Sequence, residues 1–526
     1  MRMLRLLAGL MLLAMSAAPA MALDRGGIAQ LTGGDPDEQR KALDAAAAQG
    51  DLSAIPFLRD LLADRVKLAG DTALIVDGDK VVDALDRTPA ERPADAEDVS
   101  TSNSLRLAIE ETIALLELAS PDRALRLEAV KRLQNAEFDE PRLALLAKAE
   151  QKERDAGVRD TLRQMRALGE LQSPDRALRL SAAQALRTTI SGRVREALKT
   201  RLATEEDGEL RVALTRSLRN VESSLAVGEN LGVVFSGLSL GSILLLAALG
   251  LAITYGLMGV INMAHGEMMM IGAYATYVVQ NLFRAHLPDY FQWYLAAAAP
   301  AAFIVAALVG VAIERTVIRF LYGRALETLL ATWGVSLILM QAVRSLFGAQ
   351  NVQVENPAWM SGRVFVTDNL ELPYNRIVII VFSVGVLLLV SYLLARTRLG
   401  LFVRAVTQNR GMARCVGVDS SRIDTMAFAL GSGLAGLAGV ALSQVGNVGP
   451  DLGQHYIVDS FMVVVLGGVG QLAGAVYAAL GLGVAGKILE NMSGAVLAEI
   501  ALLIFIVVFI QKRPQGLFAL GGRQAD

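Results

Sequence analysis

"LGVVFSGLSLGSILLLAALGLAITYGL" (Leu231–Leu257) contains no charged residue. It is long enough to cross a lipid bilayer as one helix, since a span takes about 20 apolar residues. Similar stretches recur to the end of the chain, and we predict spans at residues 231–257, 264–283, 294–313, 327–347, 375–395, 425–446, 457–486 and 494–511. Residues 226–526 are therefore expected to form a polytopic bundle of membrane helices.

The composition of the chain changes near Leu225. Before this point the sequence is rich in Arg, Asp, Glu, Ala and Leu, and after it charges are few. The formal net charge of −2 over 526 residues hides this contrast and indicates no partner. The lone Cys415 excludes an intramolecular disulfide and a multi-cysteine metal site. We predict three parts, namely residues 1–22, 23–225 and 226–526.

The first 22 residues have the pattern of a secretory signal peptide. Arg2 and Arg5 precede an apolar core at Leu6–Met15, and a small-residue cleavage site follows at Ala20–Ala22. An uncleaved signal anchor is the alternative. Either way, the pattern predicts that residues 23–225 are exported.

An internal repeat marks residues 23–225. "SPDRALRLEAVKRL" (Ser120–Leu133) recurs as "SPDRALRLSAAQAL" (Ser173–Leu186), and a weaker copy begins at Asp35. Each copy has the pattern of a helix start, with Ser as the cap and Pro at the first position. Each helix has one apolar face that it cannot bury alone, so we predict a HEAT-like stack of helices. The spacing exceeds the usual period of about 40–47 residues.

Two further local features are predicted in this part. Residues Ala73–Leu85 contain the turn pair Asp77-Gly78 between two apolar runs, which is typical of a β-hairpin. The Pro- and Asp-rich stretch Thr88–Ser104 is expected to be a loop. Apart from this hairpin, the expected fold class is all-α.

Basic residues predict which side of the membrane each loop faces. Two loops separated by two spans are crowded with arginines: Arg315, Arg319 and Arg324 in one, and Arg396, Arg398, Arg404, Arg410, Arg414 and Arg422 in the other. The positive-inside rule places both in the cytoplasm and the amino-terminal part outside. "QKRPQG" (Gln511–Gly516) should also be cytoplasmic, yet eight crossings leave it outside. We expect the break "GGVG" (Gly467–Gly470) to be the cause, and eight to nine spans.

"INMAHGEMMMIG" (Ile261–Gly272) places Asn262, His265 and Glu267 inside the apolar part. One hypothesis is structural, with Asn262 capping the next helix and Glu267 near its positive end. The other is a break at the cytoplasmic end of a solute pathway, where polar groups gate or bind a polar solute. On a helix His265 and Glu267 lie about 200° apart, so they cannot both face one solute. The candidate pathway also includes three glycines of the predicted break: Gly467, Gly468 and Gly470.

Three partial motifs carry less weight. "GLGVAGKI" (Gly481–Ile488) lacks the Ser or Thr of a phosphate-binding loop, so no ATPase is predicted in this chain. His265-x-Glu267 lacks the further ligands of a zinc site, so no metal site is predicted. Small residues in Ala429–Leu442 allow close helix packing, either within the subunit or across a dimer.

Four stretches carry a family resemblance: "YGLMGVINMAHGEMMMIGAY", "RLGLFVRAVTQNRGMARCVGVDSSRI", "VVVLGGVGQLAGAVYAALGLG" and "KRPQGLFALGGR". Together they resemble the permease subunits of ABC importers for branched-chain amino acids and urea, over about residues 229–523. In that family the cytoplasmic stretch R-A-x-x-x-N-x-x-x-A-x-x-x-G contacts the ATPase. The resemblance implies this coupling role for Arg404, Ala405, Asn409, Ala413 and Gly417.

The resemblance also implies partners. It leads us to expect a multi-pass permease in the bacterial inner membrane that pairs with a second permease as a heterodimer. Two cytoplasmic ATPase subunits would use ATP and Mg²⁺, and an extracytoplasmic solute-binding protein would deliver the solute. The chain itself is expected to be no enzyme, to bind no cofactor and to have no nucleic-acid partner.

The long amino-terminal part resembles the urea-type permeases, so urea is the first expected solute. A branched-chain amino acid or a short-chain amide is the alternative. A role of a different class is a membrane-anchored sensor or docking protein that uses the repeat domain.

Overall fold

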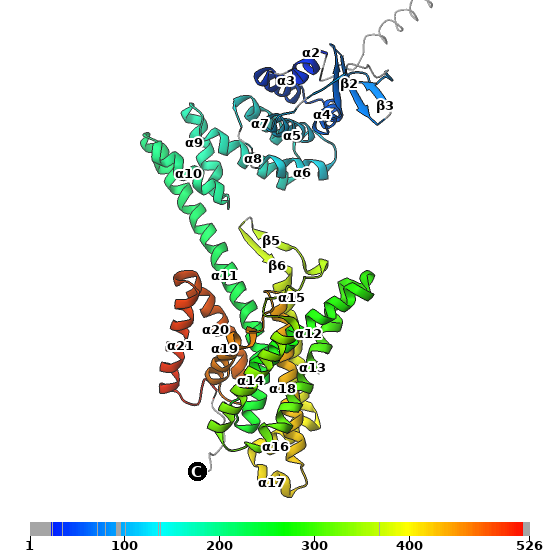
Figure 1. The fold of residues 1–526 in the computed structure, drawn as a ribbon. Coiled ribbons are helices and arrows are strands. Elements are labelled where there is room, and N and C mark those ends of the chain that lie inside the picture. Colours follow the sequence, from blue (N-terminus) through cyan, green and yellow to red (C-terminus); the bar gives the residue numbers. More distant parts are fainter. Residues whose placement is uncertain are drawn as a thin grey trace, which may run out of the picture. The chain divides into compact units, whose positions relative to one another are not determined.

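The computed structural model describes residues 23–518 except 24, 34, 71, 79, 91–95, 100, 135, 137 and 368. The predicted signal peptide lies outside the described residues. The chain divides into two compact units, Met1–Leu225 and Ala226–Asp526 (Figure 1). We call them the amino-terminal unit and the membrane unit. The division falls where the composition changes.

The amino-terminal unit is mostly helical, and its helices are α2 (Arg25–Thr32), α3 (Pro36–Gln49), α4 (Ile55–Leu62), α5 (Asn103–Glu117), α6 (Arg123–Leu133), α7 (Glu140–Lys152), α8 (Ala156–Glu170), α9 (Arg176–Ala185), α10 (Gly192–Thr204) and the start of α11 (Gly208–Met258). Short 3₁₀ turns lie at η1 (Leu52–Ala54) and η2 (Leu186–Thr188). Aspartates cap the repeat helices: Asp122 and Asp175 each accept the backbone N–H two residues on. The prediction that the repeat serines cap these helices was therefore wrong, since the Ser120 and Ser173 hydroxyls accept the aspartate N–H groups in the preceding turn.

The two copies of the repeat share one set of ion pairs. In the first copy Arg126 binds Glu153 and Arg123 binds Asp155; in the second Arg179 binds Glu205 and Arg176 binds Asp207. One repeat therefore extends over three helices, α6–α8, and the next over α9, α10 and the start of α11. The acidic E-x-D half of each copy is too short to be found from the sequence alone. Assignment to the HEAT class stays a prediction.

A small sheet lies near the beginning of the amino-terminal unit. Its strand order is β3-β2-β1-β4, with β1 at Val66–Ala69, β2 at Thr72–Asp77, β3 at Lys80–Asp83 and β4 at Glu97–Asp98. The pairing Asp77↔Lys80 confirms the predicted hairpin. The predicted loop Thr88–Ser104 contains strand β4, whose two residues pair with β1. The all-α class is thus right for most of the chain but omits this sheet and a second hairpin, β5 (Arg363–Thr367) with β6 (Leu370–Pro373).

The membrane unit contains the end of α11, α12 (His265–His286), α13 (Tyr294–Thr316), α14 (Ala325–Phe347), α15 (Tyr374–Arg396), α18 (Ser420–Ser443), α19 (Leu452–Gly467), α20 (Leu472–Ser493) and α21 (Ala495–Lys512). Two short helices, α16 (Arg398–Gln408) and α17 (Arg410–Cys415), join α15 to α18, and 3₁₀ turns lie at η3 (Pro288–Trp293), η4 (Ile318–Phe320) and η5 (Ala358–Met360). Within the described residues seven helices are long and apolar enough to cross a membrane; α12 is not among them, and α19 is a shorter apolar helix.

The predicted span 457–486 contains two helices, and the predicted break at Gly467–Gly470 is confirmed. The chain reverses at Gly468–Gln471, and α19 and α20 pack against each other as separate helices. The other seven predicted spans each correspond to one helix of the structure. The part of this unit that the structure describes therefore contains nine long helical segments, which we call legs.

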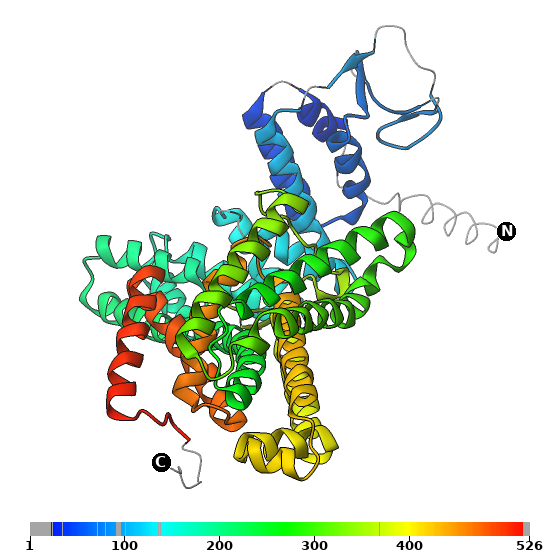
Figure 2. The same ribbon diagram turned by 60° about the horizontal axis from the view of Figure 1, so that its bottom comes forward.

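These nine legs run alternately between two ends of the bundle. At the end that carries α16 and α17, which we call the basic end, the Tyr322 hydroxyl contacts Met258 at the end of α11, and Gly470 lies against Gly256. At the opposite end, the start of α13 meets the end of α18 through Tyr294 and Gln444. An odd number of legs brings the end of α21 to the basic end, which removes the conflict over the carboxyl terminus. Figure 2 shows α16 and α17 at the basic end, in yellow.

The core of the membrane unit is the packing of α18 between α12 and α13. A Cβ on Gly439 would lie 2.0 Å from the Met269 carbonyl oxygen of α12, and one on Gly436 would lie 2.7 Å from the Ala302 oxygen of α13. The small residues of α18 therefore allow close packing within the subunit, which was one of the two predicted alternatives. This core holds the break before α12 in place.

Candidate solute pathway

The break between α11 and α12 is built by residues Gly259–Ala264. Gly259 has a positive φ of 65°, which glycine adopts without strain. The buried Asn262 side chain accepts the backbone N–H of Ala264 at 3.0 Å. The predicted cap is therefore not formed: Ala264 occupies the N-cap position of α12, and the Asn262 side chain stabilises the turn before the helix instead.

His265 is fully buried and faces α11. Its Nε2–H donates to the Ala247 carbonyl at 3.0 Å, which requires the tautomer protonated at Nε2. A Cβ on Gly250 would lie 3.0 Å from the ring carbon Cε1, so a glycine there makes room for the imidazole. His265 does not line the cavity beside the break or the larger chamber described below. Its geometry supports a role in holding α12 against α11.

Glu267 faces α14 instead. Its Oε1 accepts the Ser336 hydroxyl at 2.8 Å, while its buried Oε2 has no hydrogen-bond partner within the described residues. His265 and Glu267 therefore point toward different helices, as the helical spacing predicts. Neither is brought into contact with the other.

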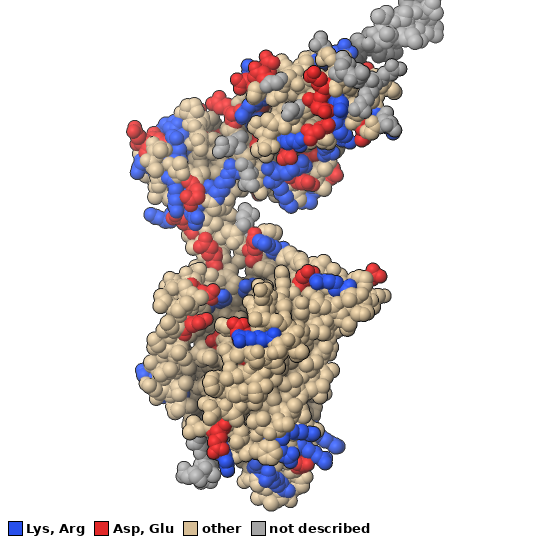
Figure 3. All heavy atoms as spheres, in the orientation of Figure 1, with Lys and Arg blue, Asp and Glu red and all other residues tan. Residues whose placement is uncertain are grey.

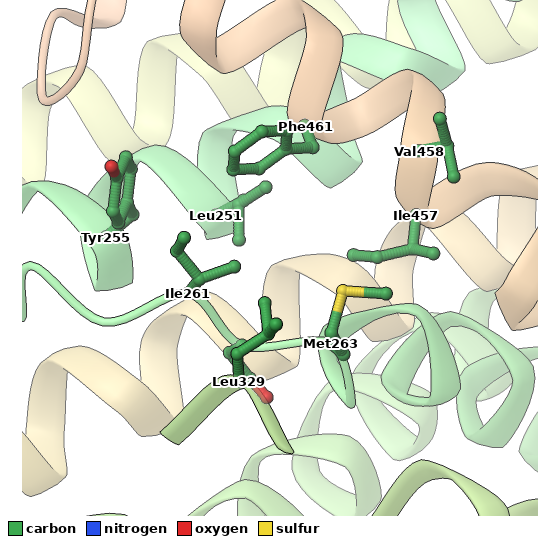
Figure 4. Close-up of a pocket in the computed structure, with 9 residues that line it drawn as sticks. Leu251, Tyr255, Ile261, Met263, Leu329, Ile457, Val458 and Phe461 are labelled. Atoms are coloured by element: carbon green, nitrogen blue, oxygen red, sulfur yellow. The ribbon is translucent and has the colours of Figure 1, made fainter. Parts of the chain in front are cut away.

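A cavity of about 260 Å³ lies beside the break. Ile261 and Met263 point into it from the break, opposite Ile457 and Phe461 of α19 (Figure 4). Asn262 belongs to its lining. The other lining side chains are hydrophobic: Leu251, Tyr255, Ile261, Met263, Leu329, Ile457, Val458 and Phe461. An apolar cavity of this kind offers a polar solute few hydrogen bonds. It suits movement of the break better than solute binding.

The glycines of the second break form a tight turn at the basic end. Gly468 and Gly470 have positive φ angles of 99° and 75°. A Cβ on Gly467 would lie 2.5 Å from the Gly474 carbonyl carbon, so α19 and α20 meet backbone to backbone. The carboxyl-terminal segment covers this turn, with the Leu517 N–H donating to the Leu466 carbonyl at 2.8 Å. These glycines shape a turn and line neither the cavity beside the first break nor the larger chamber described below.

The predicted coupling residues lie on α16, α17 and the turn that follows. Asn409 caps α17 by accepting the Met412 N–H at 2.9 Å, Ala413 is buried, and Gly417 has a positive φ of 87°. Arg404 donates to the Leu394 carbonyl at 2.7 Å and so holds α16 against the end of α15. Ala405 accepts the N–H of Asn409 in the junction between α16 and α17. The motif residues thus fold the two helices, while hydrophobic side chains beside them, Leu401, Met412 and Val416, are exposed.

A larger chamber, which sequence reasoning missed, lies toward the opposite end. Its volume is about 940 Å³, and it is bounded by α11, α15, the α18–α19 loop, α19, α20 and α21. Its ionisable lining residues are Arg376, Asp451, His455, Asp459, Lys487, Glu490 and Glu499. The charged residues of the predicted spans could have indicated this chamber, because charged residues inside apolar membrane helices usually face a water-filled cavity or a partner. Lys487 pairs with Glu490 at 2.6 Å.

The outward faces of α13, α14 and α15 contrast with the chamber. Their middle turns expose large apolar side chains, among them Leu308, Leu330 and Leu388. On the face seen in Figure 3 the middle of the membrane unit is largely uncharged, and Lys and Arg gather at the basic end. These faces suit contact with lipid, whereas the chamber does not. Within the described residues, no group of three or more His, Cys, Asp or Glu side chains is placed to hold a metal ion.

Comparison with known proteins agrees with this architecture. Residues 233–511 match the family model described as the permease component of the branched-chain amino acid transport system. The chain belongs to this permease family. One relative is the high-affinity branched-chain amino acid transport system permease protein BraD of Pseudomonas aeruginosa, 31% identical over 54% of this chain and 93% of the relative. Another is the corresponding protein LivH of Escherichia coli, 28% identical over 54% of this chain and 94% of the relative.

A further relative covers less of the permease. A probable branched-chain amino acid transport permease protein LivH of Methanocaldococcus jannaschii is 29% identical over 44% of this chain and 73% of the relative. No solved structure matched the chain. The matched region of the permease begins inside α11, so the amino-terminal unit lies outside it.

Proposed function

We propose that this permease is one of two membrane subunits of an ATP-driven importer, and that its solute is urea. The observation that carries the proposal is the chamber of about 940 Å³ with ionisable residues on α19, α20 and α21. A charge that faces lipid is costly, so this side of the permease faces water, a second permease subunit or both. The chamber forms the outer half of the pathway, and the break at Asn262 and the glycine turn at Gly467–Gly470 move during alternating access.

The sidedness follows from charge. The basic end, with α16 and α17, faces the cytoplasm by the positive-inside rule. The chamber then opens to the periplasm, where a solute-binding protein delivers urea. The amino-terminal unit lies in the periplasm as a HEAT-like repeat domain, and the permease belongs to the inner membrane.

The basic end also offers the contact for the ATPases. Met412 and Val416 expose 62% and 72% of their surface on α17 and the turn after it, although both are apolar. Exposed apolar groups on a short helix suit a groove of a partner protein. Two cytoplasmic ATPase subunits bind and hydrolyse ATP with Mg²⁺, and this permease binds no cofactor itself.

Two observations bear on the solute. The amino-terminal unit extends beyond the matched relatives, and a long extension of this kind resembles the urea-type permeases. The chamber carboxylates also suit urea, whose four N–H groups are donors. The names of the relatives favour a branched-chain amino acid, which is the second candidate.

Uptake measurements test the proposal. The permease, its partner permease, the ATPases and the binding protein are produced together in cells that lack other urea and leucine carriers. We expect ATP-dependent uptake of labelled urea and little uptake of labelled leucine. Uptake of leucine alone would replace the first candidate by the second, and uptake that is independent of ATP would reject the importer.

The ATPase contact has its own test. Val416→Asp places a charge on the exposed apolar surface, and we expect the ATPases to be lost on purification while the permease level stays normal. Arg422→Ala is the control, because Arg422 is exposed and pairs only with the nearby Asp419 in the described structure. Arg404 is a poorer choice for substitution. Its side chain donates to the Leu394 carbonyl, so its loss would also alter the packing of α16 against α15.

A further inference from the structure

The chamber and the cavity beside the first break share one lining residue, Val458 of α19. We call the smaller space the break cavity. Both spaces follow α11 and α19, and along α11 the lining passes from Ile243 in the chamber to Leu251 and Tyr255 in the break cavity. The two spaces are therefore consecutive parts of one route toward the basic end, and the Val458 side chain marks the boundary between them.

Two aromatic rings stand at the end of the break cavity that lies nearer the basic end. The rings of Tyr255 on α11 and Phe461 on α19 are 6.3 Å apart, centre to centre, with their planes at 50° (Figure 4). This separation is within the range of direct aromatic contact. Tyr255 lies one turn before the end of α11, and Phe461 lies less than two turns before the end of α19. The rings therefore meet across the route, beyond Leu251 and Val458.

Each ring stands beside a glycine break in its own helix. The Tyr255 carbonyl accepts the N–H of Gly259 at 2.8 Å, and Gly259 begins the first break with its positive φ. Phe461 precedes the glycine turn at Gly467–Gly470. Glycine reaches backbone angles that other residues avoid, so both breaks can change conformation without steric strain. A change at either break alters the separation of the two rings.

The burial of the two rings differs from that of a core contact. Tyr255 and Phe461 are each half-buried, because one side of the pair faces the break cavity. Neither side chain makes a hydrogen bond or an ion pair within the described residues. Separation of the rings thus leaves no buried polar group without a partner, which would otherwise oppose opening.

We propose that Tyr255 and Phe461 form the inner gate of the solute route, with the two glycine breaks as its hinges. The inference rests on the proposed import function and names the residues that close the route during alternating access. In this structure the rings are in contact, so the gate is closed. The chamber is then reached from the periplasm, and the break cavity is sealed from the cytoplasm.

Thiol labelling from each side of the membrane tests the gate without any transport. Cys415 is the lone cysteine, and Val458 is 49% exposed, so Val458→Cys with Cys415→Ser gives this chain one thiol on the route. Vesicles of either orientation hold the complete importer without nucleotide, and a charged, impermeant thiosulfonate is added outside them. Labelling from the periplasmic face should be faster by about 10-fold or more, since a minor open state is populated at about 10% or less.

Equal labelling rates from the two faces would overturn the gate and leave the import function, which uptake measures separately, standing. Faster labelling from the cytoplasmic face would place the chamber on that side and overturn the proposed sidedness together with the gate.

Truncation of the rings should open the route in the same assay. Phe461→Ala should raise the cytoplasmic labelling rate of the Val458→Cys thiol toward the periplasmic rate, which should itself stay unchanged. Tyr255→Ala should have the same effect and provides a second variant if the first is poorly produced. Phe505→Ala is the matched control, because Phe505 is 53% exposed on α21 and lines neither space. Slow cytoplasmic labelling in both ring variants would overturn the gate.

A reversible crosslink tests whether the gate must open for transport. Tyr255→Cys and Phe461→Cys are combined with Cys415→Ser and joined by a short bifunctional thiosulfonate. Uptake of the solute that the parent carries, urea or leucine, should fall to background and return after reduction. Tyr277→Cys with Phe347→Cys is the control, since those rings are 6.4 Å apart on α12 and α14 and line neither space. The control crosslink should leave uptake unchanged, and undiminished uptake with the gate crosslinked would overturn the proposal.

Discussion

Arg410 of α17 donates two hydrogen bonds to the Asp424 carboxylate of α18, from Nη1 at 2.8 Å and from Nη2 at 3.0 Å. Asp424 is 2% exposed, and the Arg410 guanidinium also lies 5.2 Å from the centre of the Tyr322 ring. This pair fastens the short helices of the basic end to the central helix of the bundle. We therefore expect α17 and the start of α18 to move together.

Arg410→Ala should lower both stability and uptake. The substitution leaves the Asp424 carboxylate buried and unpaired, which we expect to cost about 2–4 kcal/mol. The thermal midpoint of the purified permease in detergent measures the loss. Arg410→Ala combined with Asp424→Asn should recover part of it, because the buried charge is gone. If Arg410→Ala alone were as stable as the parent, the ion pair between Arg410 and Asp424 would not contribute to stability.

Gly439→Ala should destabilise the contact between α18 and α12. The added methyl would lie 2.0 Å from the Met269 carbonyl oxygen, and overpacking of this kind costs about 1–3 kcal/mol. Gly385→Ala in α15 is the matched control, since nothing lies within 4 Å of its Cβ position. The control should be neutral or stabilise the helix by up to about 1 kcal/mol. Equal thermal midpoints for the two variants would contradict the close packing.

The sequence predicted most helices of the membrane unit because apolar length is a local property. It placed the break at Gly467–Gly470 correctly but counted the flanking helices as one span. The reversal there depends on Gly256 and the segment at Leu517, which are distant in sequence. Contacts of this kind cannot be inferred from one stretch of residues.

The candidate site was harder to predict. Asn262, His265 and Glu267 attracted attention because they lie close together in sequence, yet they point toward different neighbours. The chamber residues are scattered from α11 to α21 along the chain, and only the fold gathers them. Asp459 and Glu499 were visible as charges in apolar helices, but their meeting was not.

Acid should weaken the amino-terminal unit through its repeated ion pairs. Hydrogen bonds from Arg176 lower the pKa of Asp207 to about 2, below the usual value of about 3.9. The folded state thus binds this proton more weakly than the unfolded state. The stabilisation is complete above about pH 4 and is lost as the pH falls toward 2.

A fragment of residues 23–225 provides the measurement, since three apolar clusters lie within it. Denaturant unfolding followed by circular dichroism should show that Arg176→Ala is less stable than the parent at pH 6. The difference should shrink below pH 4. Arg195→Ala is the control, because Arg195 pairs only with its neighbour Glu196 in the described structure. A difference that is independent of pH would reject the ion pair as its source.

Removal of the carboxyl-terminal segment should impair the permease. The N–H groups of Leu517 and Phe518 donate to the Leu466 and Gly467 carbonyls, which end α19 and have no helical partner. The Phe518 ring also stacks on Tyr477 of α20, with ring centres 5.6 Å apart. The segment therefore holds α19 and α20 together at the basic end.

Two truncations test whether the contacts of Leu517 and Phe518, rather than the residues after Phe518, are required. A chain that stops after Lys512 loses both hydrogen bonds and the stacked ring, and we expect a lower thermal midpoint and a several-fold lower uptake rate. A chain that stops after Phe518 keeps all three contacts and should behave like the parent. Gly516→Ala should resemble the shorter chain, because its Cβ would lie 2.6 Å from the Gly468 backbone. If both truncations retained full uptake, the turn between α19 and α20 would hold without the segment. If both lost it equally, the residues beyond Phe518 would be responsible instead.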